Sequence, residues 1–361
     1  MHIDRIVRGV LIVVALALFA GLGAAPASAK TKWICTHFVP KTSGFYKYMT
    51  PPFTDAVKQI TRGEVEIDCK AVGVIAPGFK GFDAVMEGLA DAHHTTSLYI
   101  VNKHPANSFY ANHPGGMPVE AFFMWWYDPK GGGKDFVKAH HRATMGLHTW
   151  GQGVPPQEVW LSHTPITKPA DLKNKKFRTA GVWAQIVTEK FGGAGTSVPG
   201  SEVYVMMERK ALDIMEWSGP SENMNKGLYE TAKYVIQPGF HWTGGLGHFS
   251  VKKGVWDGLP EKTRKDIMMA SRLANFDSYM MWHWADLPAQ KKIKARGKNV
   301  FLRMDKSLMD AMAKAAREWA YEKAAERSKK GDHWLKQVAD SYYAFYDDWR
   351  ANSDWKSPLL R

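Results

Sequence analysis

The segment Lys210-Ala-Leu-Asp-Ile-Met-Glu-Trp-Ser-Gly-Pro220 has the pattern of a short strand that runs into a glycine-containing loop. A second segment upstream, Lys176-Phe-Arg-Thr-Ala-Gly181, has the same pattern. Each segment carries one charged side chain at the end of its strand, Glu216 in the first and Arg178 in the second. In open α/β sheets, ligands bind at the carboxyl ends of the strands. We therefore expect Arg178 and Glu216 to face a binding site.

The residue types suggest what this site binds. The planar guanidinium of Arg178 matches the two oxygens of a carboxylate, which it can hold through parallel hydrogen bonds. Glu216 would repel that carboxylate unless a positive group lay between them, so a bridging metal ion is one solution. The alternative interpretation is that Arg178 is a surface residue beside the lysine-rich turn 173–176, and that Glu216 caps a loop or pairs with a lysine.

The first 29 residues have the features of a secretory signal. Arg5 and Arg8 give the positive start, residues 10–22 the apolar run, and Ala27-Ser-Ala29 a small-residue cleavage site. The apolar run is too short for a membrane span. We expect cleavage near Ala29 and export to an oxidising compartment.

The two cysteines suit that compartment. Cys35 and Cys69 lie in two segments with strand patterns that would be neighbours in a βαβ unit. A structural disulfide fits this arrangement, and two buried free thiols are the alternative. Two cysteines alone indicate neither a metal cage nor a thiol protease.

Length and charge restrict the class of protein. After cleavage roughly 330 residues remain, enough for two lobes or one large α/β unit. The formal net charge is +13, but the basic residues are scattered and form no nucleic-acid-binding signature. We therefore expect no nucleic-acid partner. The fifteen tryptophans favour a pocket or an interface built from flat rings.

Strand and helix patterns alternate along the first half of the chain. Residues 32–38, 64–71 and 92–95 have strand patterns, and residues 52–60 and 82–89 have helical spacing. This alternation predicts an α/β fold with a largely parallel sheet. From Pro260 onward the pattern is helical, and Pro288 is expected to break the first of these helices. The C-terminal helices either bridge two lobes or pair with another subunit.

Evidence for an enzyme is weak. Adjacent pairs such as His93-His94 would point to opposite faces of a strand and could not easily share one metal. The chain has no His-Glu-x-x-His segment and no nucleophile elbow. An exported metal-dependent enzyme with Glu216 as its base remains an alternative.

Several short segments occur in a recognisable order along residues 32–253: Phe82-Asp-Ala-Val85, His94-Thr-Thr-Ser-Leu-Tyr99, Lys103, Pro105-Ala106, Gly131-Gly-Gly133, Asp171-Leu-Lys173, Phe177-Arg178, Glu216-Trp217-Ser-Gly-Pro220, Gly227-Leu-Tyr229, Ala232-Lys-Tyr234 and Pro238-Gly-Phe-His241. In these segments and their order, the chain resembles the periplasmic substrate-binding proteins of tripartite ATP-independent periplasmic (TRAP) transporters. The resemblance is greatest to the branch that binds 2-oxo acids and lactate.

The resemblance implies a two-lobed fold that closes on its ligand by a hinge. Lobe I would comprise residues 30–154, completed by part of about 243–300, and lobe II residues 155–242. Residues 301–361 would form long helices that bridge the lobes or build a homodimer by exchange. The protein would be a periplasmic receptor that delivers a small carboxylate to TRAP membrane subunits. A ligand-binding subunit of a sensor would have the same pocket.

The resemblance also assigns roles to residues. Arg178 would grip the ligand carboxylate, and Tyr99 would reach the pocket from the other lobe. A cation, Ca²⁺ or Na⁺, would be held by Gln157, Glu216 and the carbonyl of Trp217, a set of oxygen ligands that suits a hard cation.

The chain departs from the pattern of this branch at two tryptophans. Trp183 stands where a small residue is usual, and Trp242 replaces a glutamate. If both rings line the pocket they favour an aromatic ligand, and if they fill it the ligand must be small.

Overall fold

The structure, a computed structural model, describes residues 30–353. The signal peptide predicted over residues 1–29 lies outside the described residues, as do residues 354–361. Among residues 30–353, no helix is both long enough and apolar enough to cross a membrane.

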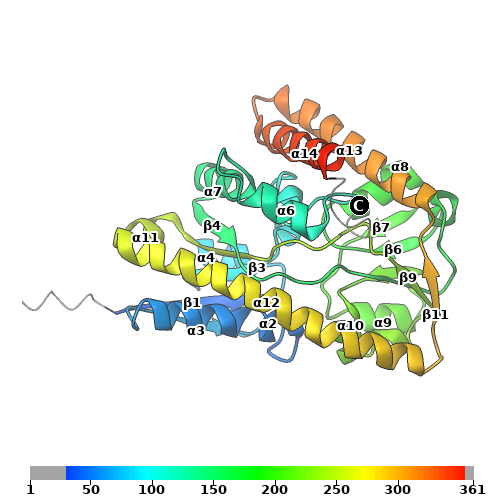
Figure 1. Cartoon of the computed structure of the whole chain (residues 1–361), viewed down its shortest axis with the longest axis horizontal. Coiled ribbons are helices and arrows are strands. Elements are labelled where there is room, and N and C mark those ends of the chain that lie inside the picture. The colour runs from blue at the N-terminus through cyan, green and yellow to red at the C-terminus, as the bar shows by residue number, and fades with distance from the viewer. Residues whose placement is uncertain (1–29, 354–361) are drawn as a thin grey trace, which may run out of the picture.

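Two separate β-sheets form the cores of two lobes (Figure 1). The first sheet has the strand order β2-β1-β3-β10-β4 and contains β1 (Thr31–His37), β2 (Val65–Lys70), β3 (Ala92–Thr95), β4 (Leu147–Gly151) and β10 (His248–Lys252). The second has the order β11-β9-β5-β8-β6-β7 and contains β5 (Trp160–Ser162), β6 (Lys176–Arg178), β7 (Ala194–Thr196), β8 (Ile214–Glu216), β9 (Tyr234–Gln237) and β11 (Val300–Arg303).

Helices surround both sheets and join the lobes. Those before β5 are α2 (Gly44–Lys47), α3 (Thr50–Ile60), α4 (Gly81–Met86), η1 (Ser97–Ile100), α5 (Asn107–Tyr110), α6 (Val119–Trp126) and α7 (Gly133–Thr144). Those of the second lobe are η2 (Pro169–Leu172), α8 (Trp183–Phe191), α9 (Val203–Glu208), α10 (Pro220–Asn225) and η3 (Leu228–Glu230). The remaining helices are α11 (Lys253–Asp257), α12 (Glu261–Ala295), α13 (Lys306–Ser328) and α14 (Trp334–Asn352).

The predicted α/β fold with two lobes is confirmed, but the prediction of a largely parallel sheet is wrong. Strands β1, β2 and β3 are parallel, as the βαβ pattern requires. However, β10 runs antiparallel to both β3 and β4, and β5 runs antiparallel to both β8 and β9. Both exceptions are strands that follow a crossing of the chain from one lobe to the other.

Of the two alternatives for the cysteines, a disulfide or two free thiols, the structure has the disulfide. Cys35 in β1 and Cys69 in β2 are direct register partners and are joined by a disulfide. The bond lies in the core of the first lobe and links two strands that are separated by a helical crossover.

Helix α12 spans the two lobes and packs against both α3 and α10 (Figure 1). The expectation that Pro288 breaks this helix is wrong, because α12 continues to Ala295. A proline inside a helix removes only one donor, and flanking contacts can compensate. Here Trp282, Ala289 and Ile293 are buried on both sides of Pro288 and hold the helix against the protein.

The C-terminal helices fold back over their own chain. Helix α13 packs on α8 of the second lobe, and α14 packs on α6 and α7 of the first. Tyr342 of α14 is buried, and its hydroxyl accepts a hydrogen bond from the amide of Met117 at 2.9 Å. The C-terminal helices thus contact helices of both lobes.

Several buried histidines are neutral in the folded state. Burial lowers the pKa of these side chains to about 3 or about 4: His93, His94, His113, His140 and His248. The folded chain thus binds these protons less readily than the unfolded chain. Their contribution to stability is complete above the ordinary histidine pKa of about 6.5, and it is lost as the pH falls toward about 4.

We expect the melting temperature to fall between pH 6.5 and pH 5, a range in which ordinary carboxylates stay ionised. The variant His93→Phe should reduce this slope, because both ring nitrogens of His93 lack a partner within the described chain. Thermal unfolding followed by circular dichroism across this range would measure both slopes. The exposed His283→Gln variant is the control, and identical slopes for all three proteins would contradict the prediction.

Candidate functional site

Arg178 and Glu216 meet at the carboxyl edge of the second sheet. Each is the last residue of its strand, and the two strands, β6 and β8, are parallel neighbours. Nη1 of Arg178 donates to the main-chain oxygen of Glu216 at 2.6 Å and to its Oε1 at 3.2 Å. Both side chains are buried. The surface interpretation of Arg178 is therefore excluded.

The protein backbone fixes the orientation of the guanidinium. Nε and Nη2 of Arg178 both donate to the carbonyl of Val198, at 3.1 and 2.8 Å. The ring of Trp217 lies beside the cation, 5.6 Å from Cζ. Since these contacts do not depend on a ligand, the positive charge is preorganised.

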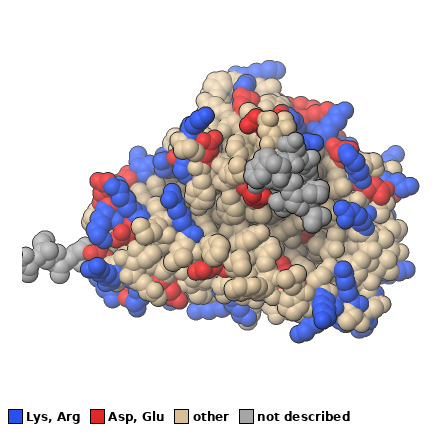
Figure 2. Space-filling model, in the orientation of Figure 1, with Lys and Arg blue, Asp and Glu red and all other residues tan. Residues whose placement is uncertain are grey.

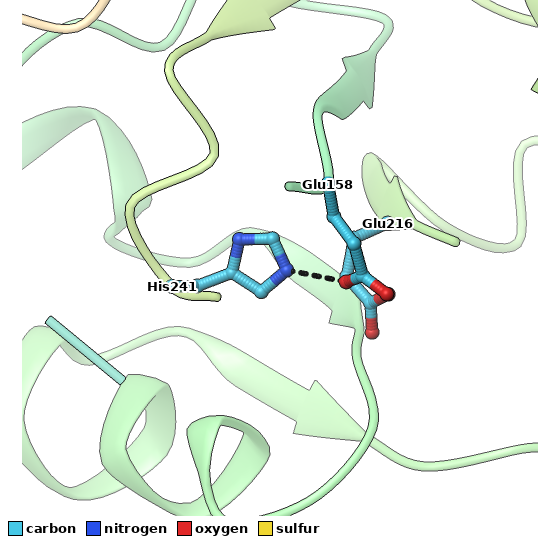
Figure 3. A group of neighbouring side chains, drawn as sticks. All are labelled: Glu158, Glu216 and His241. Carbon is cyan, nitrogen blue, oxygen red and sulfur yellow. Dashed lines mark hydrogen bonds and ion pairs between the residues drawn. The ribbon is translucent and has the colours of Figure 1, made fainter. Parts of the chain in front are cut away.

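Glu158 is a second carboxylate at the same edge (Figure 3). It lies just before β5, and the antiparallel register of β5 with β8 sets Trp160 opposite Glu216. One ligand atom each of Glu158, Glu216 and His241 lie within 4.8 Å of one another, and all three side chains are buried. Two buried carboxylates are thus adjacent beside one arginine.

The two carboxylates differ in their affinity for a proton. Burial and the neighbouring Glu216 raise the pKa of Glu158 well above its ordinary value. Burial alone would also raise the pKa of Glu216, but Arg178, His241, Glu158 and the amide of Ala180 together lower it. That amide donates to Oε1 of Glu216 at 2.5 Å. The pair therefore holds one proton, on Glu158, when no cation is bound.

His241 orients Glu158 rather than competing for a ligand. The indole of Trp160, which can only donate, gives its hydrogen to Nδ1 of His241 at 2.7 Å. Nε2 therefore carries the proton and donates to Oε2 of Glu158 at 2.9 Å. Burial lowers the pKa of His241 to about 4, so the ring is neutral. With both nitrogens in use, His241 is a second-sphere partner of any cation held by the carboxylates.

The carboxylates and the arginine line a small cavity between the lobes. Its volume is about 30 Å³, and the residues around it come from both lobes: Phe38, Phe45, Met49, Thr95, Thr96, Leu98, Tyr99, Pro155, Glu158, Arg178, Ala180, Glu216, Trp217, Trp242 and Gly247. A water molecule needs roughly 10–15 Å³ of such space. The lobes are therefore closed around a site with room for little more than water.

Three other predicted residues line this cavity. Trp217 follows Glu216, and Tyr99 reaches the site from η1 of the first lobe, where it packs edge-on against Phe38 and Phe79. Burial raises the pKa of the Tyr99 phenol, although Arg178 counteracts this. Trp242 also lines the cavity, and its indole donates to the carbonyl of Ala111 at 2.5 Å.

The structure does not bring Gln157 and Trp183 to the cavity. Gln157 is exposed and lines surface depressions on the outer side of the site. Trp183 is buried in the core, against Trp160 and Phe191. Its ring therefore fills space in the second lobe.

Sequence reasoning missed the contributions of Glu158 and His241. Glu158 is the neighbour of Gln157, which the sequence favoured as a ligand of the cation. Neighbours in an extended segment point to opposite sides. His241 was part of a matching segment, but it follows β9 in a loop whose path depends on distant contacts. A charged residue two positions before a strand of the same sheet was the available signal for Glu158.

The chain matches the bacterial extracellular solute-binding protein family 7 (DctP) over residues 35–327. It is 26% identical over 316 residues to a monocarboxylate 2-oxoacid-binding periplasmic protein of Nostoc sp., covering 87% of this chain and 84% of that protein.

Two solved structures share the fold at nearly equal sequence identity. A TRAP periplasmic solute-binding protein from Colwellia psychrerythraea, with bound calcium and pyruvate, is 24% identical with a TM-score of 0.82, covering 91% of this chain and 97% of that one. An open structure without ligand, from Rhodobacter sphaeroides, is 25% identical with a TM-score of only 0.67, covering 88% and 98%. The TM-score is thus higher to the structure with bound ligand than to the open structure, which agrees with closed lobes in the present structure.

The sequence left open whether the chain is a binding protein or an enzyme, and these findings decide between the two classes. Members of the matched family are solute-binding proteins of transporters and not enzymes, so the alternative of a metal-dependent enzyme is excluded. The match covers most of the described residues of both lobes and helix α13, and it ends before α14. The chain therefore belongs to the bacterial extracellular solute-binding protein family 7, DctP.

Proposed function

We propose that this protein is a receptor for a small 2-oxo or 2-hydroxy acid, with a metal ion held between the ligand and two glutamates. The observation that carries the proposal is the buried pair Glu158 and Glu216 beside Arg178, in a cavity between the lobes. The binding of 2-oxo acids by the Nostoc relative and of pyruvate with calcium by the Colwellia protein supports it.

Arg178 would bind the ligand carboxylate through its outer nitrogens. The carbonyl of Val198 already accepts from Nε and Nη2 of Arg178. The hydrogen bond from Nη1 of Arg178 to Oε1 of Glu216 is the longest that this guanidinium makes. A ligand carboxylate would take over that donor, and the Glu216 carboxylate would turn toward the cation. Tyr99 and Trp217 would complete the walls of the site from the two lobes.

The residues present fit a cation. Two adjacent buried carboxylates repel each other unless a proton or a metal lies between them, and carboxylate oxygens suit Ca²⁺ or Na⁺. A bound cation would neutralise this repulsion and polarise the ligand's 2-oxo or 2-hydroxy oxygen. Glu158 thus takes the place that the sequence assigned to Gln157, beside Glu216 and the carbonyl of Trp217.

The number of charges favours a divalent ion. Glu158, Glu216 and the ligand bring three negative charges to a buried site. Arg178 and a divalent cation bring three positive charges, whereas Na⁺ would leave one charge unbalanced unless Glu158 kept its proton. Because unbalanced charges are costly away from water, we infer that Ca²⁺ is preferred over Na⁺.

The cavity also limits the size of the ligand. Any ligand larger than water requires the walls to move apart, and Trp242, held by its hydrogen bond to Ala111, limits the space that this movement can open for a ring. We therefore infer a short aliphatic acid such as pyruvate or lactate. An aromatic ligand would require Trp242 to move.

Membership of the family supports delivery of this ligand to TRAP membrane subunits in the periplasm, after removal of residues 1–29. Binding energy would shift the protein from its open to its closed form, and the closed form would dock. A homodimer is a further expectation for the partners of this chain.

A second set of contacts between the lobes lies outside the ligand site. We call the bonds from Ser43 and Gly44 to Glu222 the latch. Glu222 of α10 in the second lobe accepts from the hydroxyl of Ser43 at 2.6 Å and from the amide of Gly44 at 2.8 Å, both at the start of α2 in the first lobe. Its Oε1 also accepts from the indole of Trp217 at 3.3 Å. Glu222 is buried, so these charge-assisted bonds are strong. They connect the closing of the lobes to a residue of the ligand site.

The first prediction concerns the ligand. Pyruvate with Ca²⁺ should raise the melting temperature of the mature protein, and chelation of Ca²⁺ should abolish the rise, because binding to the native state stabilises it. Arg178→Lys should lose the rise, since a lysine cannot offer two parallel donors. The surface variant Arg317→Lys is the control. No response to any 2-oxo or 2-hydroxy acid, or a full response of Arg178→Lys, would refute the proposed site.

The second prediction concerns the choice of cation. Glu158→Gln retains an oxygen for His241 but removes one negative charge, so Na⁺ should then balance the site. We expect pyruvate affinity in Ca²⁺ to fall about tenfold or more and the preference for Ca²⁺ over Na⁺ to disappear. Isothermal titration calorimetry in each cation measures this. Gln157→Ala, at the exposed neighbouring position, should behave as wild type; the reverse result for the two variants would favour the sequence-based assignment.

The third prediction concerns the latch. Glu222→Gln should weaken pyruvate binding about tenfold without changing the cation preference, because it destabilises only the closed form. Calorimetry and small-angle scattering of the liganded protein test this together. Glu208→Gln on the exposed face of α9 is the matched control. Wild-type affinity in Glu222→Gln would show that the bonds to Ser43 and Gly44 do not hold the lobes closed.

A further inference from the structure

The cavity between the lobes has walls of two kinds. The end of the second sheet brings charged groups to it, whereas the first sheet and η1 bring a set of uncharged residues: Thr95, Thr96, Leu98, Tyr99 and Gly247. Figure 2 shows one face of the molecule, on which lysines and arginines are scattered among acidic and uncharged side chains. Charge on that face selects no particular anion, so the choice of ligand depends on how the buried walls are held.

His248 connects the two segments that carry the uncharged residues. It is the first residue of β10, directly after Gly247, and its register partner on β3 is Thr95. Nδ1 of His248 lies 2.9 Å from the hydroxyl oxygen of Ser97 and 3.3 Å from the amide nitrogen of the same residue. Ser97 is the first residue of η1. One buried imidazole therefore links the sheet to the start of η1.

These contacts determine which ring nitrogen carries the proton. A backbone amide can only donate, so Nδ1 of His248 accepts from Ser97 and Nε2 is protonated. The hydroxyl of Ser97 then donates to the same nitrogen. The ring is neutral near pH 7, because burial together with His93 and His94 lowers its pKa to about 3. His248 is thus in the form that can hold η1.

The next two amides of η1 find their acceptors inside the turn. The amide of Leu98 donates to the hydroxyl oxygen of Thr96 at 3.3 Å, and the amide of Tyr99 donates to the carbonyl of Thr96 at 3.1 Å. His248 is the acceptor that comes from another element. Because the internal hydrogen bonds of a single 3₁₀ turn have poor geometry, this outside acceptor matters for the position of η1.

The side chains that follow Ser97 meet the second lobe. A Cβ atom added at Gly181 would lie 2.9 Å from Cδ2 of Leu98, so the leucine packs closely on the backbone that follows β6. The charges of Arg178 and Glu216 both act on the pKa of the Tyr99 phenol, which places this phenol near the charged wall. A shift of η1 would therefore change both contacts between the lobes.

We propose that His248 is a positioning residue of the receptor, which through Ser97 holds η1 where Leu98 and Tyr99 complete the closed site. This inference rests on the proposed function, because it takes closure of the cavity as the event that retains the ligand. Within the described chain, His248 does not itself line the cavity. Without its Nδ1, a buried amide and a buried hydroxyl would lose their acceptor, and η1 would shift to satisfy them.

The variants His248→Asn and His248→Gln test the proposal. Oδ1 of asparagine is bonded to Cγ, as Nδ1 of histidine is, so asparagine keeps an acceptor for Ser97. Glutamine places its polar atoms one bond further out, near the position of Nε2. We expect pyruvate affinity in Ca²⁺ to fall about tenfold in His248→Gln and about twofold or less in His248→Asn, measured by isothermal titration calorimetry. If His248 only filled space, the order would be reversed, because glutamine is closer to histidine in size.

Two measurements without ligand separate this proposal from the receptor function. Hydrogen exchange at the amide of Ser97 should be faster in His248→Gln than in the wild type and unchanged in His248→Asn. Nitrogen NMR of the wild type should show His248 protonated at Nε2 and not at Nδ1. If no 2-oxo or 2-hydroxy acid binds the wild type, the receptor function fails, and these two results still decide whether His248 holds η1.

The control is His148→Gln, at a buried histidine of β4 in the same sheet whose Nδ1 contacts Arg142 instead. It should bind pyruvate as the wild type does, which distinguishes the effect from a general loss of stability in the first lobe. Wild-type affinity in His248→Gln, weaker binding in His248→Asn than in His248→Gln, or a proton on Nδ1 in the wild type would overturn the proposal.

Discussion

The binding site depends on one buried positive charge, the guanidinium of Arg178. A charge removed from water is stable only if its hydrogen-bond donors are paired, and here the carbonyls of Val198 and Glu216 pair most of them. Because these acceptors belong to the backbone, the charge stays at the end of β6 regardless of side-chain motion. It lowers the pKa of Glu216 in a buried position, and the negative charge of Glu216 together with burial raises the pKa of Glu158.

The strand directions explain why these groups meet and how far the site could be predicted. Parallel strands end at the same edge, so Arg178 and Glu216 were accessible from sequence. An antiparallel strand begins at that edge, so β5 brings Glu158, two residues before its first residue Trp160, to the same place. A difference of one position exchanges the inner and outer sides of an extended segment, which separates Glu158 from the exposed Gln157. No local pattern resolves this, because the side that faces inward is set by contacts with Trp160 and His241.

The fold was predictable where local patterns are long enough to be distinctive. The N-terminal strands and the helices between them show clear alternation and helical spacing, and they form as expected. Strands β5 and β7 have only three residues each, too few for an alternating pattern. Strands β10 and β11 exist because partners distant in sequence pair with them, which is tertiary context. Pro288 illustrates the same point, since packing of the neighbouring turns outweighs its local cost.

Helix α12 keeps apolar side chains exposed to water although its other side is buried in the protein. A helix on the surface of a globular protein is apolar toward the core and polar outward. Between Met269 and Leu287, α12 is apolar on both sides, with Ala270, Ala274 and Trp282 buried against the lobes and Leu273, Phe276 and Trp284 facing water. The first set is explained by closure of the chain on itself. The second set, interrupted by Arg272 and Asp277, has no such explanation within residues 30–353.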